Sequence, residues 1–368
     1  MSTDFNSLKV AKVVSETADA KSIYFKVDSD ISQNYNYDAG QYLTLKLMVD
    51  GEELRRAYSI CTSPLENVMA VTVKRVPDGR VSNFVNDHLK EGDTVEVMPP
   101  NGKFTISIDA ANKNSYYFFA GGSGITPMMS LIKTILQTEK NSICHLFYGC
   151  RDEDNIIFEK EFEALLKEYP NNLSIRFILS HPKEVKAKGL SGMFGKKQST
   201  WSGWSGFMTR AKVQDFLKEN TATGNNKKYA ICGPSQMMDL VNNSLLELGI
   251  PSKEIMIEYF SAPILDETKD NSDKIASSAK VKATLKGVEY NFIIDNGSTI
   301  FDAMKSQGVE PPFSCLSGTC STCVAKVIKG ATVMDENVAL DDDEVSNGMT
   351  LTCQAHPTTD EVVITYDI

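Results

Sequence analysis

The first part of the chain alternates apolar and polar residues in short runs. Leucines and a valine recur at every second position from Leu43 to Val49, which is the spacing of a strand with one buried face. Asp50-Gly51 follows directly, and this dipeptide favours a hairpin turn. Two further strands are expected at 69–76 and 95–98. Many short strands separated by turn residues predict a small antiparallel β-barrel over residues 1–110.

The pattern then changes to strands that alternate with helical periodicity. Strands are predicted at 116–120, 143–148, 174–179, 229–232 and 255–260. After the first of them, apolar residues recur at helical spacing from Met128 to Ile135, with Thr126 expected as the N-cap and Pro127 as the first helical residue. This alternation predicts an α/β domain over residues 111–262, built on a parallel sheet with helices on both faces.

Two segments interrupt this organisation. Residues 183–206 are rich in Gly, Ser and Lys and contain both tryptophans, Trp201 and Trp204, so a mobile surface insertion is predicted there. Residues 263–278 lack periodicity and mix acidic, basic and small residues, which indicates an interdomain linker. A third domain then occupies residues 279–368.

Charge and hydropathy narrow the classes of function. The chain carries a formal net charge of −10, and residues 279–368 alone contain six Lys or Arg against thirteen Asp or Glu. An acidic surface argues against a nucleic-acid partner, because phosphate binding needs basic residues. No apolar run approaches the length of a membrane helix, and the segment Met1–Asp4 has no signal-peptide features. A cytoplasmic protein without a membrane partner is therefore expected.

Four of the eight cysteines form a constellation near the end of the chain. Cys315, Cys320 and Cys323 follow a C-x4-C-x2-C spacing, and Cys353 completes the set. This is the spacing of plant-type [2Fe-2S] ligands, and small residues between the cysteines let backbone N–H groups approach the sulfurs. The alternatives are a structural zinc site, which usually needs two Cys-x-x-Cys knuckles, or ordinary buried cysteines.

The residues around these cysteines carry a family resemblance. The run 312–323, Pro-Phe-Ser-Cys-Leu-Ser-Gly-Thr-Cys-Ser-Thr-Cys, followed by Leu-Thr-Cys-Gln-Ala at 351–355, is similar to a plant-type ferredoxin. The resemblance implies an α+β ferredoxin domain of the β-grasp type. Leu316 stands where plant ferredoxins often carry Arg, a departure that leaves ligation untouched and bears on the docking surface.

Two motifs in the first domain resemble the flavin-binding segments of the ferredoxin-NADP reductase superfamily. Arg56-Ala57-Tyr58-Ser59 matches its Arg-x-Tyr-Ser signature, which implies that Arg56 pairs with flavin phosphate, Tyr58 packs on the isoalloxazine and Ser59 bonds N5. The alternative is that both residues have only structural roles, with Arg56 a charged surface residue and Tyr58 part of the barrel core. The segment 79–83, with Gly79, Val81 and Ser82, resembles the family's pyrophosphate-binding turn and favours FAD over FMN.

The second domain carries the corresponding nicotinamide motifs. Residues 121–127, Gly-Gly-Ser-Gly-Ile-Thr-Pro, and 232–234, Cys-Gly-Pro, match turns of the same superfamily. The resemblance implies cofactor contacts for Gly122, Gly124, Thr126, Pro127, Cys232, Gly233 and Pro234, with Cys232 catalytic beside the nicotinamide. A ligand-free tight turn and a core cysteine are the alternatives.

Three more residues complete the expected site. Glu258 and Phe260 close the second domain, where related reductases place a carboxylate and an aromatic against the flavin. Arg151 would meet the 2′-phosphate of NADPH, which favours NADPH over NADH, although a solvated charge at a strand end fits its position equally.

The order of flavin, nicotinamide and ferredoxin domains resembles the reductase components of bacterial oxygenases. Over the ferredoxin segment the resemblance is to the reductases of phenylacetyl-CoA epoxidases (monooxygenases); ketosteroid hydroxylase, dioxygenase and hybrid-cluster-protein reductases share the design. It implies an NAD(P)H-dependent oxidoreductase with FAD and a [2Fe-2S] cluster, whose acidic third domain docks on an oxygenase or another redox acceptor. The non-enzymatic alternative is a redox-sensing or docking module.

Overall fold

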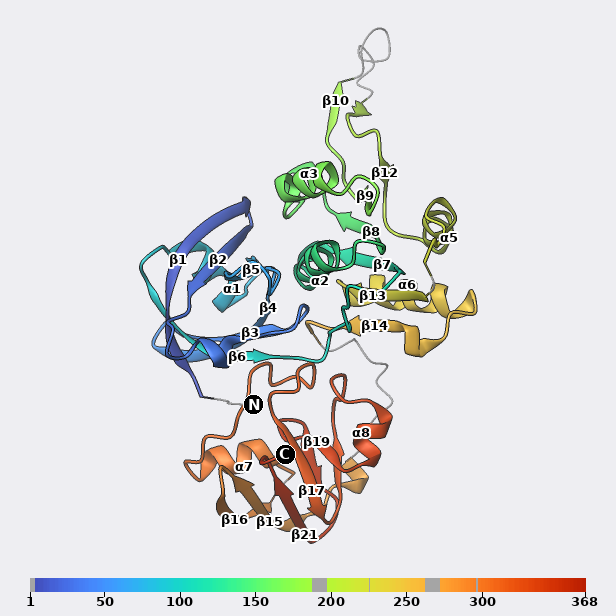
Figure 1. The fold of residues 1–368 in the computed structure, drawn as a ribbon. Helices are drawn as coiled ribbons and strands as arrows, with labels where there is room; N and C mark the ends of the chain where they lie inside the picture. The colour runs from blue at the N-terminus through green and yellow to red at the C-terminus, as the bar shows by residue number, and fades with distance from the viewer. Residues whose placement is uncertain (1–3, 187–196, 225, 262–271, 296) are drawn as a thin grey trace.

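A computed structural model describes residues 4–186, 197–224, 226–261, 272–295 and 297–368. The first unit is a six-stranded antiparallel sheet in the order β4-β3-β6-β1-β2-β5 (Figure 1). Its strands are β1 (Asn6–Thr17), β2 (Ala20–Lys26), β3 (Tyr42–Val49), β4 (Glu52–Ser59), β5 (Met69–Lys74) and β6 (Thr94–Asn101), with helix α1 (Arg80–His88) after β5. A bridge between Ile60 and Val71 joins the two edges. The sheet thus closes into the predicted barrel.

Strand β3 differs from the alternating pattern expected of it. Leu43, Leu45 and Leu47 are buried in the barrel core, as period-2 spacing predicts. Tyr42 and Thr44 on the opposite face are buried as well. Their face would be wet in an isolated barrel, but here it is covered by the C-terminal unit, which lies directly against β3 and β6 (Figure 1). One face of β3 therefore packs in the barrel core, and its other face contacts the C-terminal unit.

The second unit is a parallel sheet in the order β12-β9-β8-β7-β13-β14. The main strands are β7 (Asn114–Gly121), β8 (Ile143–Cys150), β9 (Leu173–Leu179), β13 (Asn226–Cys232) and β14 (Ile255–Glu258). Helices α2 (Ile125–Thr138) and α3 (Glu159–Glu168) cover one face, and α5 (Arg210–Glu219) and α6 (Ser235–Glu247) cover the other (Figure 1). The predicted α/β architecture is confirmed.

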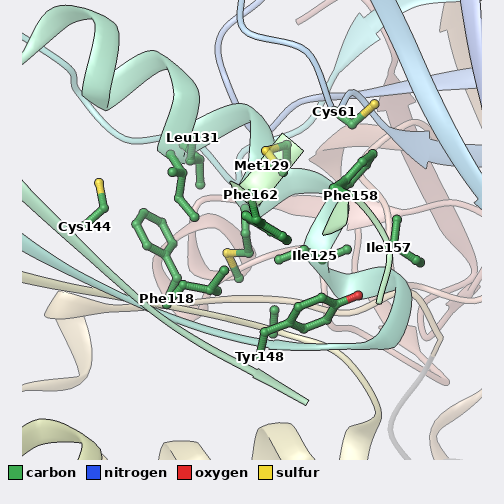
Figure 2. Packing of buried hydrophobic residues seen from close by; sticks show 14 of the residues in the cluster. Cys61, Phe118, Ile125, Met129, Leu131, Cys144, Tyr148, Ile157, Phe158 and Phe162 are labelled. Atoms are coloured by element: carbon green, nitrogen blue, oxygen red, sulfur yellow. The ribbon is translucent and has the colours of Figure 1, made fainter. Parts of the chain in front are cut away.

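The packing under α2 shows why this domain holds firmly to the barrel. Phe118 and Tyr148 rise from the sheet toward Ile125 and Met129 of the helix (Figure 2). The same apolar cluster continues into the first unit, where it includes Ala20, Ala39, Cys61 and Ala70. The two units thus share one hydrophobic core, and buried hydroxyl contacts such as that of Ser130 with the Thr62 carbonyl (2.6 Å) lie in the same interface.

The start of α2 lies earlier than its sequence predicts. A 3-10 turn over Gly122–Gly124 runs directly into the helix, which begins at Ile125 with Gly124 as its N-cap. The prediction of Thr126 as N-cap was therefore wrong: its hydroxyl donates to the Ser123 carbonyl within the first turn (3.0 Å). Pro127 is tolerated in that turn because N–H groups in a first turn have no intrahelical acceptor.

The predicted surface insertion is only partly a loop. Its described ends form an antiparallel pair, β10 (Glu184–Lys186) with β11 (Lys197–Ser199), and residues 187–196 lie outside the described residues. Strand β12 (Trp204–Ser205) joins the parallel sheet beside β9, which the sequence reasoning missed. Trp201 donates its indole N–H to the Trp204 carbonyl (2.9 Å), and Trp204 packs on Phe147. The two tryptophans thus pack at the β12 edge of the parallel sheet.

The third unit is a mixed five-stranded sheet in the order β16-β15-β21-β17-β19 with a small second sheet of β18 and β20. Its elements are β15 (Ser278–Leu285), β16 (Val288–Asp295), α7 (Ile300–Ser306), β17 (Val324–Lys329), β18 (Thr332–Met334), α8 (Asp342–Ser346), β19 (Met349–Leu351), β20 (Ala355–Pro357) and β21 (Glu361–Thr365). This is the predicted α+β ferredoxin fold. Most of the predicted linker (263–278), namely residues 263–271, lies outside the described residues, and the proposed domain boundaries stay predictions.

Among the described helices, none combines the length and the apolar character needed to cross a membrane.

Candidate functional site

A cavity of about 300 Å³ lies where the three units meet. Its walls come from four segments: the start of β3, the end of β4, the end of β14 with the residues after it, and the loop that carries the first two cysteines of the constellation. The lining residues are Tyr42, Arg56, Ala57, Ser59, Glu258, Tyr259, Phe260, Ser261, Cys315, Ser317, Thr319 and Cys320. The predicted residues Arg56, Ser59, Glu258 and Phe260 are thus brought together next to two of the predicted cluster ligands.

Two buried oxygen atoms of this region have no hydrogen-bond partner among the described residues. They are Oγ of Ser59, whose residue is 3% exposed, and Oε2 of Glu258. Burial raises the pKa of the Glu258 carboxyl to about 8. Because buried polar atoms in native proteins nearly always find a partner, these two oxygens fit a ligand that supplies hydrogen-bonding groups inside the cavity.

The three residues of the flavin motif on β4 lie in different surroundings. Arg56 is exposed and at the cavity wall, and its guanidinium donates to the Arg55 carbonyl (2.7 Å). Tyr58 is half-buried and packs against the barrel core, and it is not among the residues that line the cavity. Burial raises the pKa of its hydroxyl. The structure therefore places Arg56 and Ser59 at the cavity but Tyr58 beside it.

The segment 79–82 forms the start of α1. Gly79 is the N-cap, and Val81 and Ser82 are buried in the first turn. The Ser82 hydroxyl accepts from Val76 N and donates to the Gly79 carbonyl (both 3.1 Å), so it stabilises the turn itself. What this segment offers a ligand is therefore its backbone N–H groups at a helix start, which suit an anion.

The two nicotinamide motifs lie side by side at the carboxyl edge of the parallel sheet. β7 and β13 are neighbours, and the strand order reverses between them. Their following turns touch: a Cβ at Gly124 would lie 2.2 Å from the Cys232 carbonyl oxygen, which only glycine avoids. Open α/β sheets bind ligands at such a reversal point. Gly122, Gly124, Gly233 and Pro234 are thus gathered at the place where this fold receives a dinucleotide.

The other predicted nicotinamide residues differ in their surroundings. Cys232 is fully buried opposite Glu258 in the β13–β14 register, and burial raises the pKa of its thiol. Thr126 and Pro127 are buried in the first turn of α2. Arg151 follows β8, its side chain is 74% exposed, and its closest ion pair is a 3.9 Å contact with Asp152. Its guanidinium is thus accessible from solvent.

The four cysteines of the constellation form two pairs. The thiols of Cys323 and Cys353 are 3.4 Å apart, and Cys320 donates a hydrogen bond to Cys315. A two-iron cluster held by four cysteines needs two thiolates for each iron, which this grouping provides. The accepted hydrogen bond from Cys320 lowers the pKa of Cys315 to about 4, and the bond from Cys323 likewise lowers that of Cys353. The same bonds raise the pKa of the donors Cys320 and Cys323, so the grouping of the four sulfurs, and not their titration, is what fits a cluster.

Sequence reasoning missed Tyr42. Its hydroxyl lies 2.9 Å from Oγ1 of Thr322, between the last two cysteines of the loop, and it lines the cavity with Ser59. The only local signal was its position on a strand, because its partner is 280 residues away. Tyr259 and Thr319, which also line the cavity, were likewise not assigned a role.

Three family models match consecutive parts of the chain. They are an oxidoreductase FAD-binding domain over residues 7–106, an oxidoreductase NAD-binding domain over 118–243 and a 2Fe-2S iron-sulfur cluster binding domain over 283–358. FAD, NAD(P)H and a [2Fe-2S] cluster are therefore the cofactors of this protein.

Full-length relatives agree with this assignment. The chain is 37% identical to a component of the 1,2-phenylacetyl-CoA epoxidase of Escherichia coli K12, covering 99% of this chain and 98% of the relative. It is 31% identical to the ferredoxin reductase component of 3-ketosteroid-9-alpha-monooxygenase of Rhodococcus rhodochrous, covering 98% and 96%. The solved structure of phthalate dioxygenase reductase matches with a TM-score of 0.55 at 26% identity, over 98% of both chains. The chain thus belongs to the family of ferredoxin-reductase-type oxidoreductases with FAD and [2Fe-2S] that act as electron-transfer components of oxygenases.

Proposed function

We propose that this chain is the reductase of a phenylacetyl-CoA epoxidase, supplying that oxygenase with electrons from NADPH. The near full-length identity to a component of the E. coli epoxidase supports the choice of acceptor. The cavity whose walls hold Ser59, Glu258 and Cys320 supports the electron path, because it brings the flavin motif next to the cluster loop. When bound, FAD takes up hydride as an electron pair and releases single electrons, which the cluster carries onward.

For the flavin, each residue has a separate task. Arg56 pairs with the diphosphate, and the N–H groups at Gly79, Val81 and Ser82 receive it at the start of α1. The Ser59 hydroxyl, which has no partner among the described residues, would hydrogen-bond the flavin ring at N5. Tyr58, Thr126 and Phe260 complete the surroundings of the ring; of these, Phe260 lines the cavity and is 45% exposed, so it is free to pack on a planar ligand.

For the nicotinamide nucleotide, the touching turns are the binding surface. Gly122, Gly124 and Pro127 on one side, and Gly233 and Pro234 on the other, let the diphosphate approach the backbone. Cys232 and Glu258 lie at the adjacent ends of β13 and β14, where they orient the reacting ring and exclude water from it. The four cysteines at 315, 320, 323 and 353 hold the cluster.

The exposed Arg151 gives the preference for NADPH. A charge-assisted pair with the 2′-phosphate is worth about 1.5–3 kcal/mol, so Arg151→Gln should raise the KM for NADPH about tenfold or more. The KM for NADH should not change. Arg176→Gln, which alters an arginine paired with Glu219 (2.7 Å) in the same domain, serves as the control. Equal effects on both nucleotides would remove the basis for the NADPH preference.

The acceptor is proposed to dock on the acidic start of α8. Asp341, Asp342 and Asp343 are exposed there. The preceding segment is tied to the cluster loop, since the N–H groups of Val338 and Ala339 donate to the Gly318 carbonyl (3.0 and 3.1 Å). A negative patch so close to the cluster suits a basic partner surface and speeds association at low salt.

The deciding experiment compares acceptors at low and high salt. Electron delivery and coupled product formation are measured with the oxygenase components of a phenylacetyl-CoA epoxidase, a 3-ketosteroid 9α-monooxygenase and a glycine betaine monooxygenase. We expect the first to be preferred, and Asp342→Asn/Asp343→Asn to raise its KM and flatten its salt dependence. Asp360→Asn, on an exposed acid at another edge of the same unit, is the control. Faster coupling to another oxygenase would overturn the choice of acceptor.

A further inference from the structure

One face of β3 contacts both ends of the loop that carries the first three cysteines. The Tyr42 hydroxyl lies 2.9 Å from Oγ1 of Thr322, and the Thr44 hydroxyl donates to Oγ of Ser314 (3.0 Å). Both contacts are buried. Ser314 immediately precedes Cys315, and Thr322 immediately precedes Cys323. Tyr42 and Thr44 are two residues apart, so the pleat of the strand directs both side chains to the same face.

The same face of this strand pair carries part of the flavin motif, because residues paired across two strands point to one side of the sheet. Tyr42 pairs in register with Ser59, and Thr44 pairs with Ala57, across β3 and β4. Tyr42 also lines the cavity together with Ser59 and Cys320. A displacement of the cluster loop relative to β3 therefore changes its position relative to the proposed flavin contact.

A third contact fixes the segment that leads into the loop. The Arg55 guanidinium stacks over Phe313, 4.0 Å from the ring centroid, and lies 4.9 Å from the Phe5 ring. It pairs with Glu53 at 2.7 Å and with Glu310 at 3.6 Å, and its side chain is 11% exposed. A flat guanidinium can stack and bond simultaneously, which a lysine ammonium cannot do.

We propose that Tyr42, Thr44 and Arg55 are positioning residues that dock the cluster loop on the flavin-binding barrel and thereby set the rate of electron transfer from the flavin to the cluster. Among the described residues, the buried apolar clusters of the third unit include none from the barrel. With no shared core, a few directional contacts decide how much of the protein is docked in the productive geometry. The proposal rests on the proposed function only in placing FAD at Ser59.

The first test removes one oxygen atom. In Tyr42→Phe holoprotein mixed with NADPH, cluster reduction should slow about three- to tenfold relative to flavin bleaching, the effect of losing one buried hydrogen bond. The EPR spectrum and the potential of the cluster should not change. Tyr35→Phe is the matched control, because its hydroxyl donates to the Val97 carbonyl (2.8 Å) inside the barrel.

A second pair of variants separates docking from folding. Arg55→Lys keeps the charge but loses the flat stack, and should slow cluster reduction alone. Its control, Arg176→Lys, alters an arginine that stacks on Trp204 and pairs with Glu219, away from the third unit. Thr44→Val gives a further test if Tyr42→Phe folds poorly.

Amide hydrogen exchange supplies a readout that does not depend on turnover. In oxidised protein without nucleotide, residues 313–323 and 42–44 should exchange faster in Tyr42→Phe and Arg55→Lys, and not in either control. Unchanged exchange together with unchanged cluster reduction would overturn the proposed docking role. A wild-type protein whose flavin is not reduced by nucleotide would instead overturn the proposed function, and the exchange result would still decide the docking role.

Discussion

The barrel meets its two neighbours in different ways. Toward the nicotinamide unit it shares one buried apolar cluster, reinforced by Lys133, which bridges Glu66 and Glu161 at 2.5 and 2.7 Å. Toward the ferredoxin unit it offers two hydroxyl pairs, the Arg55 stack and ion pairs such as Lys103–Glu344 and Lys286–Asp4. Apolar burial is strong and not directional, whereas polar contacts are weaker and depend on geometry. The apolar interface holds the barrel and the nicotinamide unit together, whereas the polar interface determines how the ferredoxin unit is oriented on the barrel.

The sharpest way to separate the two interfaces is to remove the cluster. Cys353→Ser should abolish cluster binding and electron delivery to one-electron protein acceptors, because four thiolates are required. Flavin content and flavin reduction by NADPH should persist, since the Cys353 sulfur contacts Cys323 and Gln354 of its own unit. Iron content, the visible spectrum and stopped-flow bleaching check this. Loss of flavin together with iron would show that the ferredoxin unit is not separable.

A pair of aromatic truncations compares the interfaces in free energy. Phe104 is buried in the shared cluster, and Phe104→Ala should lower the free energy of unfolding by about 3–5 kcal/mol. Phe313→Ala removes the Arg55 stack at the polar interface, worth about 1 kcal/mol, and the contact of the half-buried Phe313 ring with Phe301 in its own unit, so it should cost less than Phe104→Ala. Denaturant titrations followed by flavin and by cluster absorbance measure both. Equal losses would contradict the distinction.

Acid should weaken the nicotinamide unit specifically. His145 is buried against Tyr117, its Nδ1 meets the Ser174 hydroxyl (2.8 Å), and burial lowers its pKa from 6.5 to about 4. Below pH 6.5 the unfolded chain binds a proton that the folded one does not, so stability falls as pH drops from 6.5 toward 4. We expect a loss of about 1–2 kcal/mol at pH 5 from this group. His145→Gln should flatten this part of the stability curve; an unchanged slope would count against it.

Salt should have the smallest effect, and only on the ferredoxin side. The interfacial pairs Lys103–Glu344 and Lys286–Asp4 are substantially exposed, and such pairs contribute about 0–1 kcal/mol each. Raising NaCl from about 0.05 to about 0.5 M should increase exchange in the cluster loop slightly and leave that of α2 unchanged. A comparable change in α2 would mean that both interfaces are ionic.

The sequence predicted what depends on local order. Strand alternation, the glycine turn after β7 and the cysteine spacing are short-range patterns, and the structure has the corresponding elements. It did not reveal the burial of Tyr42 and Thr44, because their partners at 322 and 314 are distant in the chain. It also placed the start of α2 too late, because the helix already begins at Ile125, with Gly124 as its N-cap. It missed β12 because a strand of two residues shows no periodicity.

The contact between the turns after β7 and β13 limits how this protein can change. Because the Cys232 carbonyl occupies the space that a side chain at Gly124 would need, neither turn can be enlarged or shifted without a matching change in the other. The two turns are thus coupled sterically, although they are far apart in the sequence. We expect natural variants of this enzyme to alter them jointly or to leave both alone, and engineered exchanges of nucleotide-binding segments to succeed only when the two turns are transplanted together.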